Sequence, residues 1–150
     1  GFISIMTSKG NYFVPLKDVK NNVDTIDKWK VVMSKASAEH AGQVDKDGRR
    51  KIISRTEILP PYSICSESYL LLNVISTKTE AENMLVYIKT RFFRYLLSTI
   101  LLTQNISKDK FQFVPLQDFS HPWTDEMLYK KYGLDENEIA FIESMIRPME

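Results

Sequence analysis

The stretch that decides the fold is YLLLNVISTKTE, residues 69–80. Its first seven residues, 69–75, are a nearly continuous apolar run of strand length, which predicts a central buried strand. The last four residues fit a capping box, with Thr77 as the N-cap of a helix and Glu80 at its N3 position. The chain therefore changes from strand-like to helix-like sequence at Ser76.

The sequence before this stretch predicts strands and loops. Residues 2–6 alternate apolar and polar side chains, and residues 29–33 and 51–54 are apolar and β-branched. Residues 34–50 contain two glycines and little hydrophobic period, which predicts a long loop. Asp47-Gly48 favours a turn near its end, and Pro60-Pro61 favours a break between strands.

The sequence after Ser76 predicts helices. The expected segments are an amphipathic helix over 79–90, a core helix over 92–102, a loop over 103–110, an extended segment over 111–116, a short helix over 124–132 and a last helix after Asp135. Strands followed by helices predict an α+β fold. We expect a single domain, residues 1–150, in which a mixed or antiparallel twisted sheet from the N-terminal half packs against helices from the C-terminal half.

The composition is that of an ordinary globular domain, with 43% hydrophobic and 26% charged residues. No stretch reaches the roughly 18 apolar residues of a membrane span, and the first residues lack a secretory signal pattern. Cys65 is the single cysteine, so a reducing compartment, the cytoplasm, is expected. Because a strand pattern begins at Phe2, we also expect this chain to be cut from a longer one.

Charge is unevenly distributed along the chain. Residues 28–55 hold eight basic and three acidic side chains, whereas residues 118–150 hold eight acidic and three basic ones. A basic middle segment suits phosphate, and an acidic tail does not. The candidate DNA-binding residues are Lys35, His40, Lys46, Arg49, Arg50, Lys51 and Arg55, with a second group of Lys89, Arg91 and Arg94 at a helix junction. The alternatives are a solvated hairpin tip for the first group and simple solvation of a helix for the second.

The motifs that resemble catalytic sites are incomplete. Leu59-Pro60-Pro61-Tyr62 resembles the motif of adenine methyltransferases, but Leu59 stands where Asp or Asn must bond the target amino group. This favours a linker between strands. Asp18-Val19-Lys20 resembles part of a nuclease site, but no acidic residue precedes Asp18. The two histidines and Cys65 match no zinc spacing. We therefore predict no catalytic residue, metal or cofactor in this chain.

Three strings in the second half resemble a known family. They are FFRYLL (92–97) followed by TQNIS (103–107), FQFVPLQDF (111–119) and LYKKYGL (128–134). The likeness covers about residues 50–150 and is to the C-terminal region of Eco57I-like adenine-specific restriction-modification methyltransferases. One departure is that Ser120-His121-Pro122-Trp123 is shorter than the corresponding stretch in many relatives.

This resemblance implies a non-catalytic, sequence-specific DNA recognition domain of a bacterial type II restriction-modification enzyme. Its partners would be double-stranded DNA and the upstream methyltransferase or nuclease domains of the same chain. S-adenosylmethionine, and Mg in a parent that also cleaves, would act in those upstream domains. The alternatives are a protein–protein docking module within the same enzyme, or a divergent Mg-dependent endonuclease centred on Asp18 and Lys20.

Overall fold

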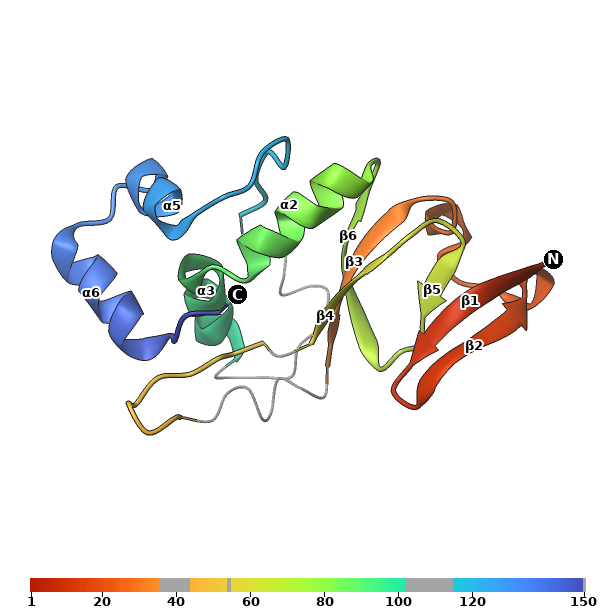
Figure 1. The fold of residues 1–150 in the computed structure, drawn as a ribbon, viewed down its shortest axis with the longest axis horizontal. Coiled ribbons are helices and arrows are strands. Elements are labelled where there is room, and N and C mark those ends of the chain that lie inside the picture. Colours follow the sequence, from red (N-terminus) through yellow and green to blue (C-terminus); the bar gives the residue numbers. More distant parts are fainter. Residues whose placement is uncertain (36–43, 54, 102–114, 150) are drawn as a thin grey trace.

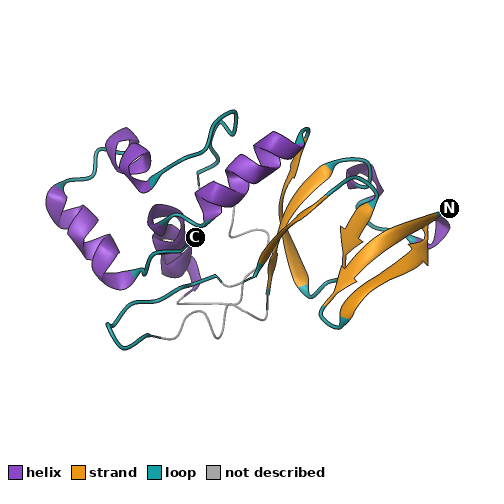
Figure 2. Ribbon diagram, in the orientation of Figure 1, coloured by secondary structure: helices purple, strands orange, loops and turns teal. Residues whose placement is uncertain are grey.

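The computed structural model describes residues 1–35, 44–53, 55–101 and 115–149. Strands occupy one end of the molecule and helices the other, so the α+β prediction is confirmed (Figures 1 and 2). The strands are β1 (Phe2–Thr7), β2 (Gly10–Pro15), β3 (Trp29–Ser34), β4 (Thr56–Leu59), β5 (Ser63–Cys65) and β6 (Tyr69–Ile75). The helices are α2 (Lys78–Ile88), α3 (Arg91–Leu101), α5 (Asp125–Lys131) and α6 (Glu136–Met145), with 3₁₀ turns η1 (Leu16–Asp18) and η2 (Val23–Thr25).

The strands form two sheets of three strands where the sequence predicted one. In the first sheet the order is β2-β1-β5, and β1 is antiparallel to β2 and parallel to β5. In the second the order is β4-β3-β6, with β3 antiparallel to both neighbours. The second sheet lies between the first sheet and the helices (Figure 1).

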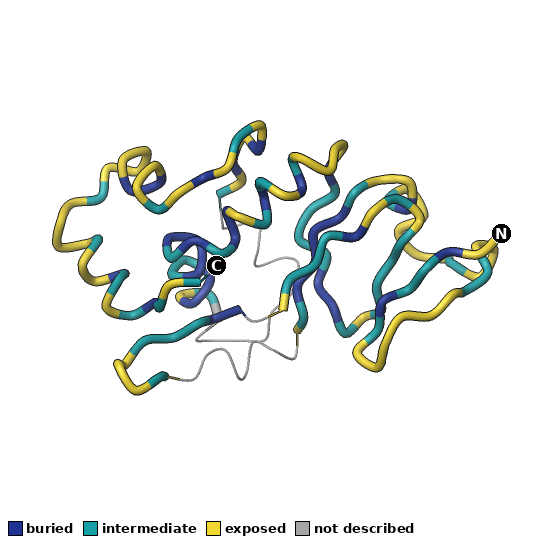
Figure 3. The backbone as a smooth tube through the Cα atoms, in the orientation of Figure 1, coloured by how far each residue is buried: buried dark blue, intermediate teal, exposed yellow. Residues whose placement is uncertain are grey.

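The central strand is β3, so the prediction that residues 69–75 form the central strand is wrong, although they do form strand β6. The physical reason is burial on both faces. Residues 30–33 of β3 are all buried, whereas the middle of β6 is half-buried. Figure 3 shows the buried positions along β3 and α3 and the exposed positions along β2. An uninterrupted apolar run therefore does not by itself identify the central strand of this sheet.

The two faces of β3 pack into two different cores, because successive side chains of a strand point to opposite faces. Val31 and Met33 join the large core formed with the helices. Val32 joins a smaller cluster with Met6, Leu59 and Tyr69, which connects the two sheets. Strand β3 is therefore the element that joins the strand end of the molecule to the helical end.

The strand predicted at 51–54 is also wrong, because the strand begins at Thr56. Ile52 has a φ of 71°, which is incompatible with a strand, and Ser54 lies outside the described residues. Ile52 and Ile53 are both buried in the core formed with the helices. Their apolar, β-branched side chains therefore pack into the core from an irregular segment and not from a strand.

Helix starts follow the sequence closely. The Oγ1 atom of Thr77 accepts a hydrogen bond from the Glu80 amide at 3.2 Å, and that of Thr124 accepts one from Met127 at 3.2 Å. Asp135 forms the predicted cap with Glu138. The predicted caps at Thr77 and Asp135 are confirmed, and Thr124 caps the short helix that was predicted to begin there. The predicted loop at 103–110 and residues 111–114 of the predicted extended segment lie outside the described residues.

The start of α3 is capped by another helix. Asp125, the first residue of α5, accepts hydrogen bonds from the amides of Phe92 at 2.9 Å and Arg91 at 3.2 Å. A carboxylate at a helix N-terminus satisfies free N–H groups and interacts favourably with the helix dipole. This contact fixes α5 against the junction between α2 and α3.

Candidate nucleic-acid interface

Four basic side chains line one hollow of about 560 Å³: Lys51, Arg55, Lys89 and Arg147. Lys51 lies in the irregular segment before β4, and Arg55 directly precedes that strand. Lys89 follows the end of α2, and Arg147 follows α6. Of the described residues that line this hollow, none is acidic. A cluster of basic side chains without an acidic lining residue attracts anions, phosphate groups among them.

The C-terminal segment is held beside the basic loop by backbone hydrogen bonds. The amide of Arg50 donates to the carbonyl oxygen of Met145 at 2.7 Å, and the amide of Arg147 donates to that of Arg50 at 3.0 Å. Ile146, between them, is fully buried. These bonds place Arg147 next to Lys51.

The turn predicted at Asp47-Gly48 is confirmed. The amide of Gly48, which has a φ of 79°, donates to the carbonyl oxygen of Asp45 at 3.0 Å. The Asp45 carboxylate accepts from the amides of Arg49 and Asp47, both at 2.9 Å. The bond from Arg49, followed by that from Asp47, lowers the pKa of Asp45, so the carboxylate holds the turn in its charged form. The turn presents Lys46 to solvent.

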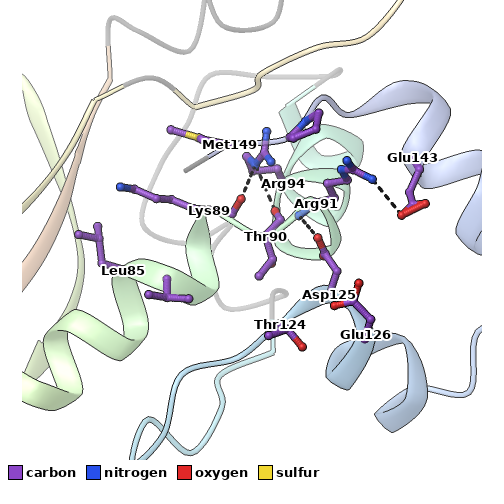
Figure 4. Close-up of a pocket in the computed structure, with 12 residues that line it drawn as sticks. Leu85, Lys89, Thr90, Arg91, Arg94, Thr124, Asp125, Glu126, Glu143 and Met149 are labelled. Atoms are coloured by element: carbon purple, nitrogen blue, oxygen red, sulfur yellow. Dashed lines mark hydrogen bonds and ion pairs between the residues drawn. The ribbon is translucent and has the colours of Figure 1, made fainter.

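The guanidinium of Arg94 is bonded to the backbone of residues that line the hollow, and Figure 4 shows its bonds to Lys89 and Thr90. Its Nε donates to the carbonyl oxygens of Lys89 at 3.0 Å and Thr90 at 3.2 Å, and its Nη1 donates to that of Lys51 at 3.2 Å. Burial lowers the pKa of Arg94 to about 10, so the group stays charged at neutral pH. These bonds fix the backbone of two residues that line the hollow.

The prediction that Arg94 contacts DNA is therefore wrong. Its side chain has no exposed surface and cannot reach a duplex from the folded domain. Its charge is used to join the end of α2 to the segment before β4. The sequence could not distinguish a solvated cation from a buried one, because both occur at helix junctions.

Three of the predicted cations are paired with carboxylates. Arg49 contacts Asp47 at 3.4 Å and Arg55 contacts Glu57 at 3.6 Å. The guanidinium of Arg91 contacts Glu143 at 2.9 Å. By contrast, the side chains of Lys51, Lys89 and Arg147 take part in none of the ion pairs between described residues.

The other predicted residues do not line the hollow or lie outside the described chain. Lys35 and Lys46 are exposed, Arg50 is half-buried, and none of the three lines the hollow. His40 lies outside the described residues. The structure thus brings Lys51, Arg55 and Lys89 together from the two groups that the sequence kept apart.

Arg147 is the residue that the sequence reasoning missed. It lies within 118–150, the stretch assigned to an acidic tail unsuited to phosphate. Pro148 favours extended backbone at the residue before it, which could have indicated that Arg147 lies beyond the last helix. The pairing with Arg50 has no local sequence signal.

The two incomplete catalytic motifs lie elsewhere. Leu59-Pro60-Pro61-Tyr62 connects β4 to β5, and the amide of Tyr62 donates to the carbonyl oxygen of Ile26 at 2.7 Å, which confirms the predicted linker. Asp18 and Lys20 are exposed, and the Lys20 Nζ donates to the carbonyl oxygen of Lys17 at 2.9 Å. Among residues 1–35, 44–53, 55–101 and 115–149, no three His, Cys, Asp or Glu side chains gather to hold a metal ion.

No protein-family model, curated protein or solved structure matches this chain. In the described part of the chain, none of the helices has the length and apolar character needed to cross a membrane. The hollow and the residues that position it are therefore the observations from which a function can be inferred.

Proposed function

We propose that this domain binds duplex DNA through the basic hollow, as the target recognition part of an Eco57I-like restriction-modification methyltransferase. The observation that carries the proposal is the convergence of Lys51, Lys89 and Arg147 on one hollow, with no ion pair to a described carboxylate. Contacts of Lys and Arg with phosphates supply most of the sequence-independent affinity for DNA. The resemblance of the second half to that family supports the same conclusion.

Base recognition is assigned to the turn beside the hollow. The turn at 45–49 carries Lys46 and Arg49, and it leads directly into Lys51. Phosphate contacts fix the register of a protein on DNA, and side chains that reach base edges read the sequence. In this proposal the hollow holds the phosphate backbone of the DNA, and the turn enters a groove of the duplex.

The domain carries out no chemistry in this proposal. Methyl transfer from S-adenosylmethionine to adenine, and Mg-dependent cleavage in a parent that also cuts, belong to upstream domains of the same bacterial enzyme. The location we propose is the cytoplasm, where such an enzyme meets its DNA.

The salt dependence of binding tests the proposal. Four cations on phosphates predict that log K falls with log salt with a slope of about −3 to −4. Replacing three of them in Lys51→Ala/Lys89→Ala/Arg147→Ala is expected to reduce the slope to about −1 and to weaken binding to all sequences alike. Fluorescence anisotropy of a labelled duplex, titrated with the domain across a salt series, measures both quantities.

The matched control is Lys9→Ala/Lys17→Ala/Lys78→Ala, which removes the same charge from exposed lysines that do not line the hollow. An equal loss of binding in this control would contradict the proposal. The docking alternative predicts no DNA binding by the wild-type domain, together with binding to the separately purified upstream domains. The endonuclease alternative predicts Mg-dependent nicking that Asp18→Ala abolishes.

A further inference from the structure

A second pocket, of about 530 Å³, adjoins the basic hollow (Figure 4). The two share Lys89, Pro148 and Met149 as lining residues. The two compartments therefore adjoin along these three residues. Pockets of this size accommodate small molecules, and a duplex is too wide to enter one.

The two compartments differ in charge. The pocket is lined by three basic and three acidic side chains: Lys89, Arg91, Arg94, Asp125, Glu126 and Glu143. The hollow is lined by four basic side chains and, among described residues, no acidic one. A ligand with an anionic end and a neutral polar end would place the anion in the hollow and the neutral part in the pocket.

Most of the charged groups in the pocket are already bonded to the protein. The oxygens of Asp125 accept the amides of Arg91 and Phe92, and Glu143 pairs with the guanidinium of Arg91. Among the described residues, Glu126 has no ion pair and no side-chain hydrogen bond. The Glu126 carboxylate is thus a free acceptor in the pocket.

One buried donor also lacks a partner. The Nη2 atom of Arg94 is buried and makes no hydrogen bond with the described residues, although the residue lines the pocket and has no exposed surface. Because this atom has no exposed surface, a ligand in the pocket cannot reach it, and Glu126 is the polar group that remains open to one. Leu85, Val86 and Met149 add aliphatic surface to the same pocket.

We propose that the pocket binds one unstacked nucleobase whose 5′-phosphate lies in the hollow, so the ligand is a nucleoside 5′-phosphate unit. A base offers apolar faces to the aliphatic side chains and hydrogen-bond donors along its edge to Glu126. The unit can come from a free nucleotide or from an unpaired strand end. The inference rests on the proposed function for the phosphate and adds the base.

Calorimetric titration of the whole domain tests this inference. The probes are the four deoxynucleoside 5′-monophosphates, with 2-deoxyribose 5-phosphate and inorganic phosphate for comparison. At least one nucleotide is expected to bind about tenfold more tightly than 2-deoxyribose 5-phosphate, because burial of the base adds hydrogen bonds. A duplex with one unpaired 5′-nucleotide and a blunt duplex then distinguish a strand end from a free nucleotide.

Two variants locate the base. Val86→Trp, at a half-exposed position that lines the pocket but not the hollow, is expected to remove the tenfold preference and leave phosphate binding unchanged. Thr79→Trp, at an exposed position on the same helix outside both compartments, is the matched control. Glu126→Gln keeps the shape of the pocket and is expected to change the order of preference among the four bases, a result that does not depend on how the tryptophan packs.

The outcomes separate this inference from the proposed function. If no nucleotide binds more tightly than 2-deoxyribose 5-phosphate, the base site is overturned, while salt-dependent binding of the blunt duplex still supports DNA recognition. If nucleotides bind more tightly and Val86→Trp abolishes the preference, but the blunt duplex does not bind, the base site stands and the proposed function fails.

Discussion

A buried cation organises each end of this molecule, and the two act over different distances. In the strand end, the Nζ of Lys30 donates to the carbonyl oxygens of Thr25 at 2.8 Å, Ile26 at 3.2 Å and Lys28 at 2.7 Å. In the helical end, Arg94 donates to those of Lys51, Lys89 and Thr90. Burial lowers the pKa of both groups.

The difference lies in where the accepting carbonyls come from. Those bonded by Lys30 all belong to the turn that precedes its own strand, so its loss is a local event. Those bonded by Arg94 belong to two segments far apart in the chain, and both segments line the basic hollow. Similar chemistry thus shapes one turn in the first region and assembles the candidate site in the second.

The largest effect is expected for Arg94→Met. Three carbonyl oxygens lose their donor, at about 1 kcal/mol each, so the free energy of unfolding should fall by about 3 kcal/mol. DNA affinity should fall as well, because Lys51 and Lys89 lose their fixed backbone. Urea unfolding and anisotropy titration measure the two changes.

Arg94→Lys is the control, because it keeps the charge but has one nitrogen in place of the guanidinium fork. It should recover part of the stability and less of the affinity. Unchanged DNA affinity in a folded Arg94→Met protein would contradict the comparison, because the effect of Arg94 would then be as local as that of Lys30.

The second effect concerns Tyr87, a fully buried residue of the helical core whose hydroxyl donates to the carbonyl oxygen of Pro115 at 2.6 Å. Burial raises its pKa to about 12, from about 10 in an unfolded chain. The folded state therefore holds this proton more tightly, and the resulting stability is complete below pH 10 and lost as the pH rises to about 12.

The shift corresponds to about 2 to 3 kcal/mol. The difference in unfolding free energy between wild type and Tyr87→Phe should therefore shrink by about that amount as the pH rises through this range. Denaturation of both proteins at several pH values measures the difference. An unfolding free-energy difference that stays constant with pH would contradict the raised pKa of the Tyr87 hydroxyl.

Lys30→Met is expected to have a smaller effect, about 1 to 2 kcal/mol, because Thr25 and Lys28, which supply two of the three carbonyls, are half-buried and exposed, respectively, so water can replace the lost donor there. Hydrogen exchange should rise in this turn and remain unchanged around Lys51 and Lys89. Binding of DNA should be unaffected. A loss of DNA affinity equal to that of Arg94→Met would contradict the division between a local and a long-range cation.

The smallest effect is expected for the ion pair of Arg91 with Glu143, which joins α3 to α6 at the rim of the pocket. Both side chains are partly exposed, so a double-mutant cycle of Arg91→Met and Glu143→Gln should give a coupling energy of about 0.5 kcal/mol. The coupling should decrease in high salt. A value as large as that for Arg94 would remove the distinction between buried and partly exposed cations in this region.

The sequence predicted the features that depend on neighbouring residues. It predicted the caps at Thr77 and Asp135, the start of the short helix at Thr124 and the turn at Gly48, because each needs particular side chains within four positions of one another. The segment at Ile52 was misassigned as a strand, because its apolar, β-branched character fits both a strand and a buried irregular segment.

In the candidate site, the sequence identified Lys51, Arg55 and Lys89 as DNA-binding candidates but did not show that they line one hollow. Arg94 was placed on the surface, and Arg147 was assigned to the acidic tail. Burial depends on what packs above a side chain, and that is set by contacts between distant segments.

The sequence by itself determined the α+β class, the starts of the helices and the basic character of the middle segment, because these follow from local hydrogen bonding and side-chain pattern. Tertiary structure alone decided that β3 is central, that Arg94 is internal and that Arg147 lies beside Lys51. Each of these depends on free energy gained when distant parts of the chain exclude water together, and no short stretch of sequence encodes that energy.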